Sequence, residues 1–280
     1  MSQSQSQSPS QSPSKSPSKS MPTVDTHAHV FRRDLPMSPE AITLPHHDFE
    51  LDEYEAILDR HGVQHACIAA PSFLGTYNDY TLQAIADRPR FKTTVILDPA
   101  TDPYILRMMD RDRAEGVRLS LRNQTTLPDF TSHDWVRFLR RLADIGWHVH
   151  LHIDGQRLPM VLPALQAAPV NLVVDHFGRP DPALGAQSEG FQALLRAFDT
   201  GRTWAKLSGG FRIGCDPAPL AARLLEVGGP DRLVWGSDCP FTDFADRVTY
   251  DSVLQQYAAW VPEPADRARI DAAAKALYRF

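Results

Sequence analysis

Two histidines stand two residues apart near the start of the chain, in the segment Val-Asp-Thr-His-Ala-His-Val at 24–30. The segment reads as a short β-strand, and residues i and i+2 of a strand point to the same face. His27 and His29 can therefore reach one point, and neutral imidazole is the commonest metal ligand among side chains. Alone, a His-x-His pair is a weak indication of a site. Its weight comes from three polar residues that end other apolar runs: His152, His176 and Asp238.

The segments that carry these residues follow the pattern of short strands buried on both faces. We expect strands at Thr23–His27, Gln64–Ala70, Phe91–Leu97, Gly116–Leu121, His148–Ile153, Asn171–Asp175, Thr203–Leu207 and Arg232–Gly236. A helix is expected from Leu51, with its apolar residues on one face and Gly62 at its end. Further helices are expected at Asn78–Asp87, Pro103–Arg113, Ser132–Ile145 with Ser132 as N-cap, Leu158–Ala167, Phe191–Phe198, Pro217–Val227, Thr249–Trp260 and Pro264–Tyr278.

This alternation of about eight β-α units predicts a single-domain (β/α)₈ barrel of the TIM type over residues 21–280. The alternative fold is a doubly wound open sheet, but no Gly-x-Gly-x-x-Gly segment follows the first strand. A barrel carries its chemistry at the C-terminal ends of the strands. The polar candidates fall at those ends: His27, His29, Arg118, His152, His176, Lys206 and Asp238.

Composition narrows the class of protein. The chain has 280 residues, of which 42% are hydrophobic and 22% charged, and a formal net charge of -5. This balance predicts no nucleic-acid partner, and no apolar run approaches the ~20 residues of a membrane helix. Three widely spaced cysteines form no disulfide framework, which favours the cytoplasm. Residues 2–20 contain only Ser, Gln, Pro and Lys, so we expect residues 1–20 to be a disordered leader, with Met21 as an alternative start.

Four segments resemble those of the amidohydrolase superfamily: Val-Asp-Thr-His-Ala-His-Val-Phe (24–31), Val-Asp-His-Phe-Gly-Arg-Pro (174–180), Lys-Leu-Ser-Gly (206–209) and Leu-Val-Trp-Gly-Ser-Asp-Cys-Pro (233–240). The likeness is greatest to the branch that holds 2-pyrone-4,6-dicarboxylate lactonase, sugar lactonases and related decarboxylases. It implies that Asp238 accepts a proton from the attacking water and later returns it. It also implies that His176 polarises the scissile carbonyl.

The same resemblance leaves two interpretations of the histidines open. His27, His29 and His152, with Asp238 as a fourth ligand, would suit one divalent ion such as zinc or manganese. The pyrone lactonases are described as working without metal, with the His-x-His pair polarising the substrate directly. They carry a tyrosine where this chain has His152, whereas the decarboxylases carry a ligand histidine there. His152 therefore favours a metal, and metal-independent activity remains the alternative.

Arginines on several mouth loops predict a carboxylated substrate, because a guanidinium binds a carboxylate through two parallel hydrogen bonds. By resemblance, Arg118, Arg179 and Arg212 bind substrate carboxylates. Arg122 follows the fourth strand, in a region where a further arginine is expected and Gln124 stands nearby. Tyr77, in the loop after the second strand, could also line the mouth. For each arginine, a surface salt bridge is the alternative.

We therefore expect a hydrolase that opens a small carboxylated lactone, either pyrone-dicarboxylate-like or a sugar lactone, in aromatic or sugar acid catabolism. The main alternative is a metal-dependent decarboxylase or hydro-lyase of an unsaturated or aromatic acid, using the same ligands. A catalytically silent barrel is less favoured, because no catalytic residue is missing. The expected partner is the small-molecule substrate, and a homodimer is expected only because dimers are the commonest assemblies.

Overall fold

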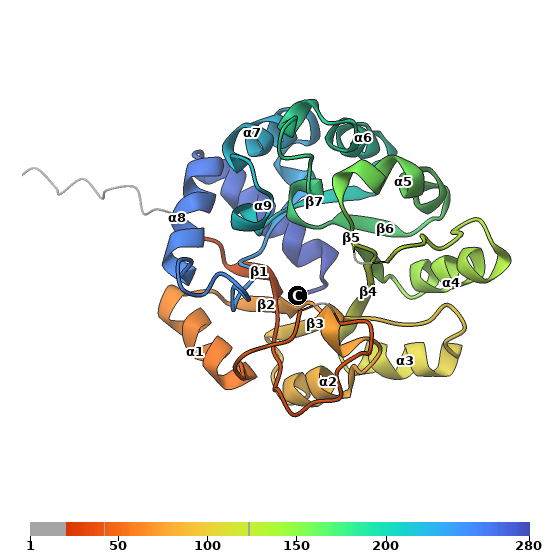
Figure 1. Ribbon diagram of the computed structural model, residues 1–280. Coiled ribbons are helices and arrows are strands. Elements are labelled where there is room, and N and C mark those ends of the chain that lie inside the picture. Colours follow the sequence, from red (N-terminus) through yellow and green to blue (C-terminus); the bar gives the residue numbers. More distant parts are fainter. Residues whose placement is uncertain (1–20, 42, 123) are drawn as a thin grey trace, which may run out of the picture.

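Eight parallel strands form one sheet in chain order, and helices surround it (Figure 1). The computed structural model describes residues 21–41, 43–122 and 124–280, so the predicted leader at 1–20 lies outside the described residues. The strands are β1 (Val24–Ala28), β2 (His65–Ile68), β3 (Phe91–Val95), β4 (Ala114–Ser120), β5 (His148–His152), β6 (Asn171–Val174), β7 (Thr203–Leu207) and β8 (Leu233–Trp235). A parallel bridge between Ala28 and Cys239 joins the first strand to the segment after the last. The predicted (β/α)₈ barrel is confirmed.

Helices lie outside the strands and cover the barrel wall (Figure 1). The α-helices are α1 (Leu51–His61), α2 (Asp79–Ile85), α3 (Pro103–Arg111), α4 (His133–Asp144), α5 (Leu158–Ala167), α6 (Glu189–Ala197), α7 (Pro217–Gly228), α8 (Tyr250–Trp260) and α9 (Pro264–Leu277). The 3-10 helices are η1 (Ser72–Leu74), η2 (Gly155–Arg157), η3 (His176–Gly178), η4 (Gly185–Gln187), η5 (Phe198–Thr200), η6 (Gly210–Arg212) and η7 (Pro230–Arg232). None of the helices in the described part is long and apolar enough to cross a membrane.

Local signals account for several of these boundaries. Gly62 ends α1 in the left-handed conformation, with φ of 70°, as predicted. Asp102 and Asp216 cap α3 and α7 by accepting a hydrogen bond from a first-turn amide, and a proline follows each of them. Ser132 stands at the N-cap of α4, but its side chain makes no capping hydrogen bond.

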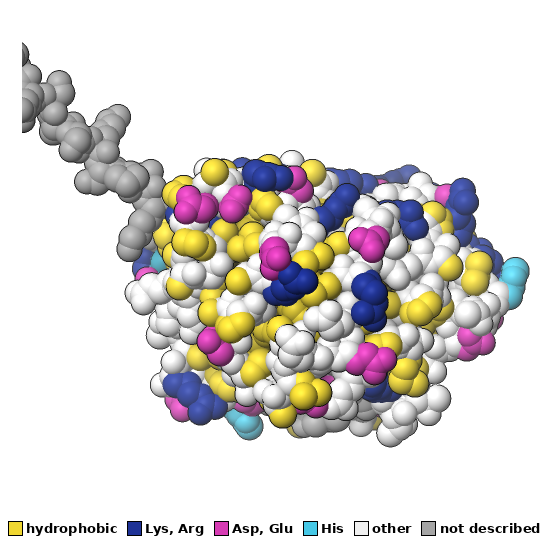
Figure 2. All heavy atoms as spheres, turned by 90° about the horizontal axis from the view of Figure 1, so that it is seen from above, with side chains coloured by type: hydrophobic (Ala, Val, Ile, Leu, Met, Phe, Trp, Pro, Cys, Tyr) yellow, Lys and Arg dark blue, Asp and Glu magenta, His cyan; other side chains and the backbone are white. Residues whose placement is uncertain are grey.

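The strands are buried along nearly their whole length, as parallel strands covered by helices must be. Polar side chains also occupy the barrel interior, and His148, His150 and Lys206 are among those without solvent exposure. The C-terminal end lies near the barrel axis in Figure 1, and the Tyr278 hydroxyl lies 2.7 Å from Nε2 of His150. On the face shown in Figure 2, acidic and basic side chains are interspersed.

Candidate active site

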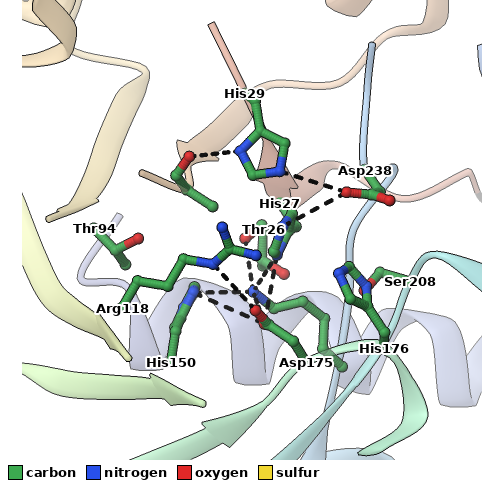
Figure 3. Close-up of polar contacts among 12 residues, drawn as sticks. Thr26, His27, His29, Thr94, Arg118, His150, Asp175, His176, Ser208 and Asp238 are labelled. Atoms are coloured by element: carbon green, nitrogen blue, oxygen red, sulfur yellow. Dashed lines mark hydrogen bonds and ion pairs between the residues drawn. The ribbon is translucent and has the colours of Figure 1, made fainter. Parts of the chain in front are cut away.

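The carboxyl end of β1 and the segment after β8 bring His27, His29 and Asp238 together. The two histidines flank Ala28, the last residue of β1, and so share one face. The Asp238 amide donates to the His27 carbonyl at 2.7 Å, and the His29 amide donates to the Cys239 carbonyl at 2.8 Å. The Nε2 atoms of His27 and His29 consequently lie 3.7 and 3.5 Å from the same carboxylate oxygen, Asp238 Oδ1 (Figure 3).

The backbone around this cluster is specialised. A Cβ at Gly236 would lie 2.6 Å from Cβ of His27, and a Cβ at Gly209 would lie 2.7 Å from Nδ1 of His176. Only glycine leaves room for the imidazoles at both positions. His176 and Asp238 have φ of 53° and 65°, a region that residues other than glycine rarely adopt and that is concentrated at functional sites.

His176 begins η3, directly after β6, and its ring faces the cluster. Its Nδ1 lies 2.8 Å from Oγ of Ser208, and its ring centroid lies 4.9 Å from that of His27. His152 packs edge-on against His176, with ring centroids 5.5 Å apart. His152 thus lies at the mouth, as the strand-end position predicts, but beside His176 and outside the group formed by His27, His29 and Asp238. Within the described part of the chain, its buried Nδ1 has no hydrogen-bond partner.

A layer of buried charge lies directly beneath. The Asp175 carboxylate lies 3.1 Å from Nζ of Lys206 and 3.4 Å from Nε of Arg118. Arg118 also donates through Nη1 to the Ala70 carbonyl at 2.9 Å. Sequence reasoning placed Arg118 and Lys206 at strand ends but assigned nothing to Asp175. The sequence does contain a signal for Asp175, because this carboxylate directly follows the apolar run of β6 and directly precedes His176.

Neighbouring charges set the protonation of Asp238, and burial sets that of His176. Burial raises the pKa of the Asp238 carboxyl, but the charge of Arg212 and the contacts with the histidines outweigh it and hold that pKa well below its usual value. Arg212 donates to Oδ2 of Asp238 and, at 2.9 Å, to the Thr242 carbonyl. Burial lowers the pKa of His176 to about 4. At neutral pH the site therefore holds an ionised Asp238 and a neutral His176.

The predicted arginines fall into two environments. Arg118 is buried against Asp175, whereas Arg122, Arg179 and Arg212 stand on loops at the mouth. Arg179 and Arg122 both donate to Oδ1 of Asp154, at 3.2 and 3.3 Å. Their exposure differs, since the Arg179 side chain is 10% exposed and that of Arg122 is 45% exposed. The three mouth arginines follow β4, β6 and β7, so that part of the rim is cationic.

A cavity of about 850 Å³ opens on the other side of the mouth, over the loops that follow β1 to β4. Among the described residues that line it, Arg118 is the one cationic side chain, and Glu40 and Asp98 are acidic. Its neutral polar lining consists of Ser38, Ser72, Thr76, Ser120, Gln124, Thr125 and Thr126. Tyr77, predicted as a mouth residue, is half-buried and is not part of this lining.

Two groups of side chains in the described chain could hold a metal ion by distance: His27 with Asp175 and His176, and His27 with His29 and Asp238. Nε2 of His27 is buried without a hydrogen-bond partner among the described residues, as a ligand atom would be. The charge around it does not suit a cation. Each carboxylate already has a guanidinium or ammonium partner: Asp175 has Arg118 and Lys206, and Asp238 has Arg212.

Enzymes with this barrel fold carry out their chemistry at the carboxyl ends of the strands. This barrel has a carboxylate, imidazoles and guanidinium groups at those ends, which places it among the TIM-barrel enzymes. The particular family follows from comparison with known proteins. The family model described as Amidohydrolase matches residues 24–280, so the chain belongs to the amidohydrolase family and is a hydrolase.

Named relatives extend this finding. The chain is 28% identical over 231 residues to 4-sulfomuconolactone hydrolase of Hydrogenophaga intermedia, covering 79% of this chain and 76% of that protein. A structure from Pseudomonas putida described as a 2-pyrone-4,6-dicarboxylic acid hydrolase is 35% identical, with a TM-score of 0.84, and the match covers 92% of this chain and 98% of that one. A protein from Acinetobacter baumannii with the same description and with citric acid bound is 30% identical, with a TM-score of 0.88 and coverage of 93% and 100%.

Proposed function

We propose that the protein hydrolyses a small lactone that carries an anionic group. The observation that carries this proposal is the ionised Asp238, held against the Nε2 atoms of two histidines at the barrel mouth. A carboxylate within hydrogen-bond reach of a water can accept its proton as the water attacks a carbonyl. The names of the relatives, which include hydrolases of lactones, support the same reaction class.

In the proposed reaction, Asp238 takes one proton from water while the water oxygen bonds to the lactone carbonyl carbon. His27 and His176 face the developing oxyanion and stabilise it through hydrogen bonds. The ring carbon–oxygen bond then breaks, and Asp238 returns its proton to the ring oxygen. The product is a hydroxy acid, which is an enol and hence a keto acid if the ring was a pyrone. Its new carboxyl group ionises near neutral pH and releases one proton.

We infer that this reaction uses side chains alone, although zinc or manganese remains the alternative suggested by His152. Lys206, Arg118 and Arg212 supply three positive charges against two negative ones on Asp175 and Asp238. The cluster is therefore cationic before any ion is added. Coulomb repulsion inside a buried site is only weakly screened, so a divalent cation would bind here at a substantial cost.

The two sides of the mouth suggest which lactone fits. Arg179 and Arg212 favour one carboxylate or sulfonate on the cationic side. The cavity over β1 to β4 favours hydroxyl groups, because seven neutral polar side chains line it and because Glu40 and Asp98 repel a second anion. Its one cation among the described residues, Arg118, is already paired with Asp175. A sugar acid lactone, with one carboxylate and several hydroxyls, meets both conditions better than a pyrone dicarboxylate.

A proton-release assay tests the proposal. The purified protein is supplied with sugar acid lactones, neutral sugar lactones and carboxylated pyrones, each in weak buffer with a pH indicator, and carbon dioxide is recorded in parallel. We expect proton release from the sugar acid lactones, little from their methyl esters, and none from the Asp238→Asn variant. Carbon dioxide release from an unsaturated or aromatic acid, without lactone opening, would instead establish the decarboxylase alternative.

A further inference from the structure

The ammonium group of Lys206 is buried in the barrel interior, in contact with His27. Lys206 belongs to β7, and its side chain has no solvent exposure. Its Nζ lies close to four atoms: the Thr26 carbonyl oxygen at 3.2 Å, His27 Nδ1 at 3.0 Å, His150 Nδ1 at 3.3 Å and Asp175 Oδ1 at 3.1 Å. Figure 3 shows His27, His150 and Asp175 turned toward one another below His29.

Counting protons assigns the direction of each hydrogen bond. An ammonium has three donors and no acceptor. Its three hydrogen bonds go to the Thr26 carbonyl, His27 Nδ1 and His150 Nδ1, which all accept from it. Asp175 Oδ1, at 3.1 Å, is an ion-pair partner outside hydrogen-bond geometry. Among the described residues, the competing acceptor for a proton on His27 Nδ1 is Asp175 Oδ1, and at 3.5 Å it lies beyond the usual N–H···O range.

His29 is held in the opposite way. Its Nδ1 lies 2.7 Å from the Ala69 carbonyl oxygen, which can only accept, so His29 carries a proton on Nδ1. Nε2 of His29 faces Asp238 Oδ1 at 3.5 Å. His27, whose Nδ1 accepts from Lys206, offers an N–H at Nε2.

We propose that Lys206 is a positioning residue that fixes the Nε2–H tautomer of His27, so that His27 meets the substrate as a hydrogen-bond donor. The two histidines are then held differently: Nδ1 of His27 accepts from Lys206, Nδ1 of His29 donates to the Ala69 carbonyl, and both Nε2 atoms face Asp238. An imidazole that carries its proton on Nε2 has no lone pair there for a metal. Lys206 consequently opposes metal binding by the group of His27, His29 and Asp238. The statement that His27 donates to the substrate rests on the proposed function. The statement that His27 carries its proton on Nε2 does not.

The tautomer can be measured without substrate. The full-length protein is labelled with ¹⁵N at its histidines, and the ring nitrogens are identified in long-range ¹H–¹⁵N correlation spectra, with His27 assigned by its loss in His27→Gln. We expect an Nε2–H tautomer for His27 and an Nδ1–H tautomer for His29. In Lys206→Met, the Asp175 carboxylate should draw the His27 proton to Nδ1, whereas Lys206→Arg should retain the original tautomer.

Lys92→Met is the matched control. It removes a partly buried lysine that pairs with a carboxylate, Glu115, at the opposite end of the barrel, and it should leave the His27 resonances unchanged. Because Lys206→Met could fail to fold, the tautomer of the unaltered protein decides the assignment independently. An Nδ1–H tautomer of His27 in that protein would overturn the proposal, as would a folded Lys206→Met variant in which the tautomer does not change.

A Co²⁺ titration followed by visible absorption gives a second readout. We expect Lys206→Met to bind Co²⁺ about tenfold or more tightly than the unaltered protein, since outer-shell partners of a ligand histidine change metal affinity by such factors. Equal Co²⁺ affinity in the two proteins would contradict the metal-opposing role of Lys206. Neither measurement involves turnover. A protein that opened no lactone would therefore refute the proposed function and leave the tautomer result standing.

Discussion

The two ends of the barrel each bury a carboxylate between two cations, and they differ in what remains unpaired. At the closed end, Glu115 binds Lys92 through Oε1, at 2.5 Å, and Arg279 through Oε2, so both oxygens are occupied. At the mouth, Asp175 has Lys206 and Arg118, yet the histidine above it keeps an unpartnered Nε2 among the described residues. A buried carboxylate with two cations thus stabilises the fold at one end of the barrel. At the other end the same arrangement leaves an imidazole nitrogen free to contact a substrate.

Replacing one carboxylate at each end gives the largest contrast. Asp238→Asn should lower kcat by about a thousandfold, because an amide cannot accept the water proton, while the fold survives. Glu115→Gln should leave kcat nearly unchanged and lower the free energy of unfolding by about 2 to 3 kcal/mol, because its two cations lose their partner but keep some solvent contact. Steady-state kinetics and urea denaturation of both variants measure the two effects. A large loss of kcat in Glu115→Gln would remove the distinction between the two ends.

Acidification should weaken the fold through the buried histidines of the barrel interior. Burial lowers the pKa of His176 to about 4 and that of His148 to about 3, from an ordinary 6.5, and it holds that of His150 well below it. Below pH 6.5 the unfolded chain binds protons that the native chain does not, so stability falls as the pH drops from about 6.5 toward 4. Each such histidine contributes up to about 1.4 kcal/mol per pH unit.

Urea denaturation at pH 7.5, 6.5 and 5.5 tests this expectation. The loss of stability should be about 0.3 kcal/mol per histidine between the first two values and about 1 kcal/mol per histidine between the second and the third. His148→Leu removes one of these histidines at a distance from Asp238, and it should make the fall shallower. An unfolding free energy that does not change between pH 7.5 and 5.5 would mean that these histidines are not held neutral in the native state.

Much of the fold could be predicted because its signals are local. The apolar run of each strand and the glycine after α1 need no information from distant residues. The predicted strands agree with the observed ones to within two residues at either end. The mouth residues followed from one rule, that barrel strands end at a common edge. His27, His29 and Asp238 meet there because β1 and β8 are neighbours in the closed barrel.

The rest of the site depends on which strands are neighbours and on hydrogen positions. His152 obeys the strand-end rule but lies on β5, so it meets His176 after β6 and not the histidines of β1. The different environments of His27 and His29 have no counterpart in the sequence, because Lys206 and the Ala69 carbonyl that distinguish them come from β7 and from the segment after β2. The sequence predicts that Arg118 binds a substrate carboxylate, but in the structure Arg118 pairs with the Asp175 carboxylate.

The smallest expected effect separates the two arginines that share Asp154. Arg179 is nearly buried beside the mouth and Arg122 is half-exposed, although their contacts to Asp154 Oδ1 are almost equal in length. If Arg179 binds the substrate anion, Arg179→Met should raise KM by about tenfold to a hundredfold, the usual worth of a hydrogen bond to a charged group. Arg122→Met should change KM by less than about threefold, because an exposed ion pair contributes little. Initial-rate kinetics on an anionic lactone and on its methyl ester measure these effects. The rise in KM of Arg179→Met should disappear with the ester. A rise of equal size on both substrates would show that Arg179 only supports the loop.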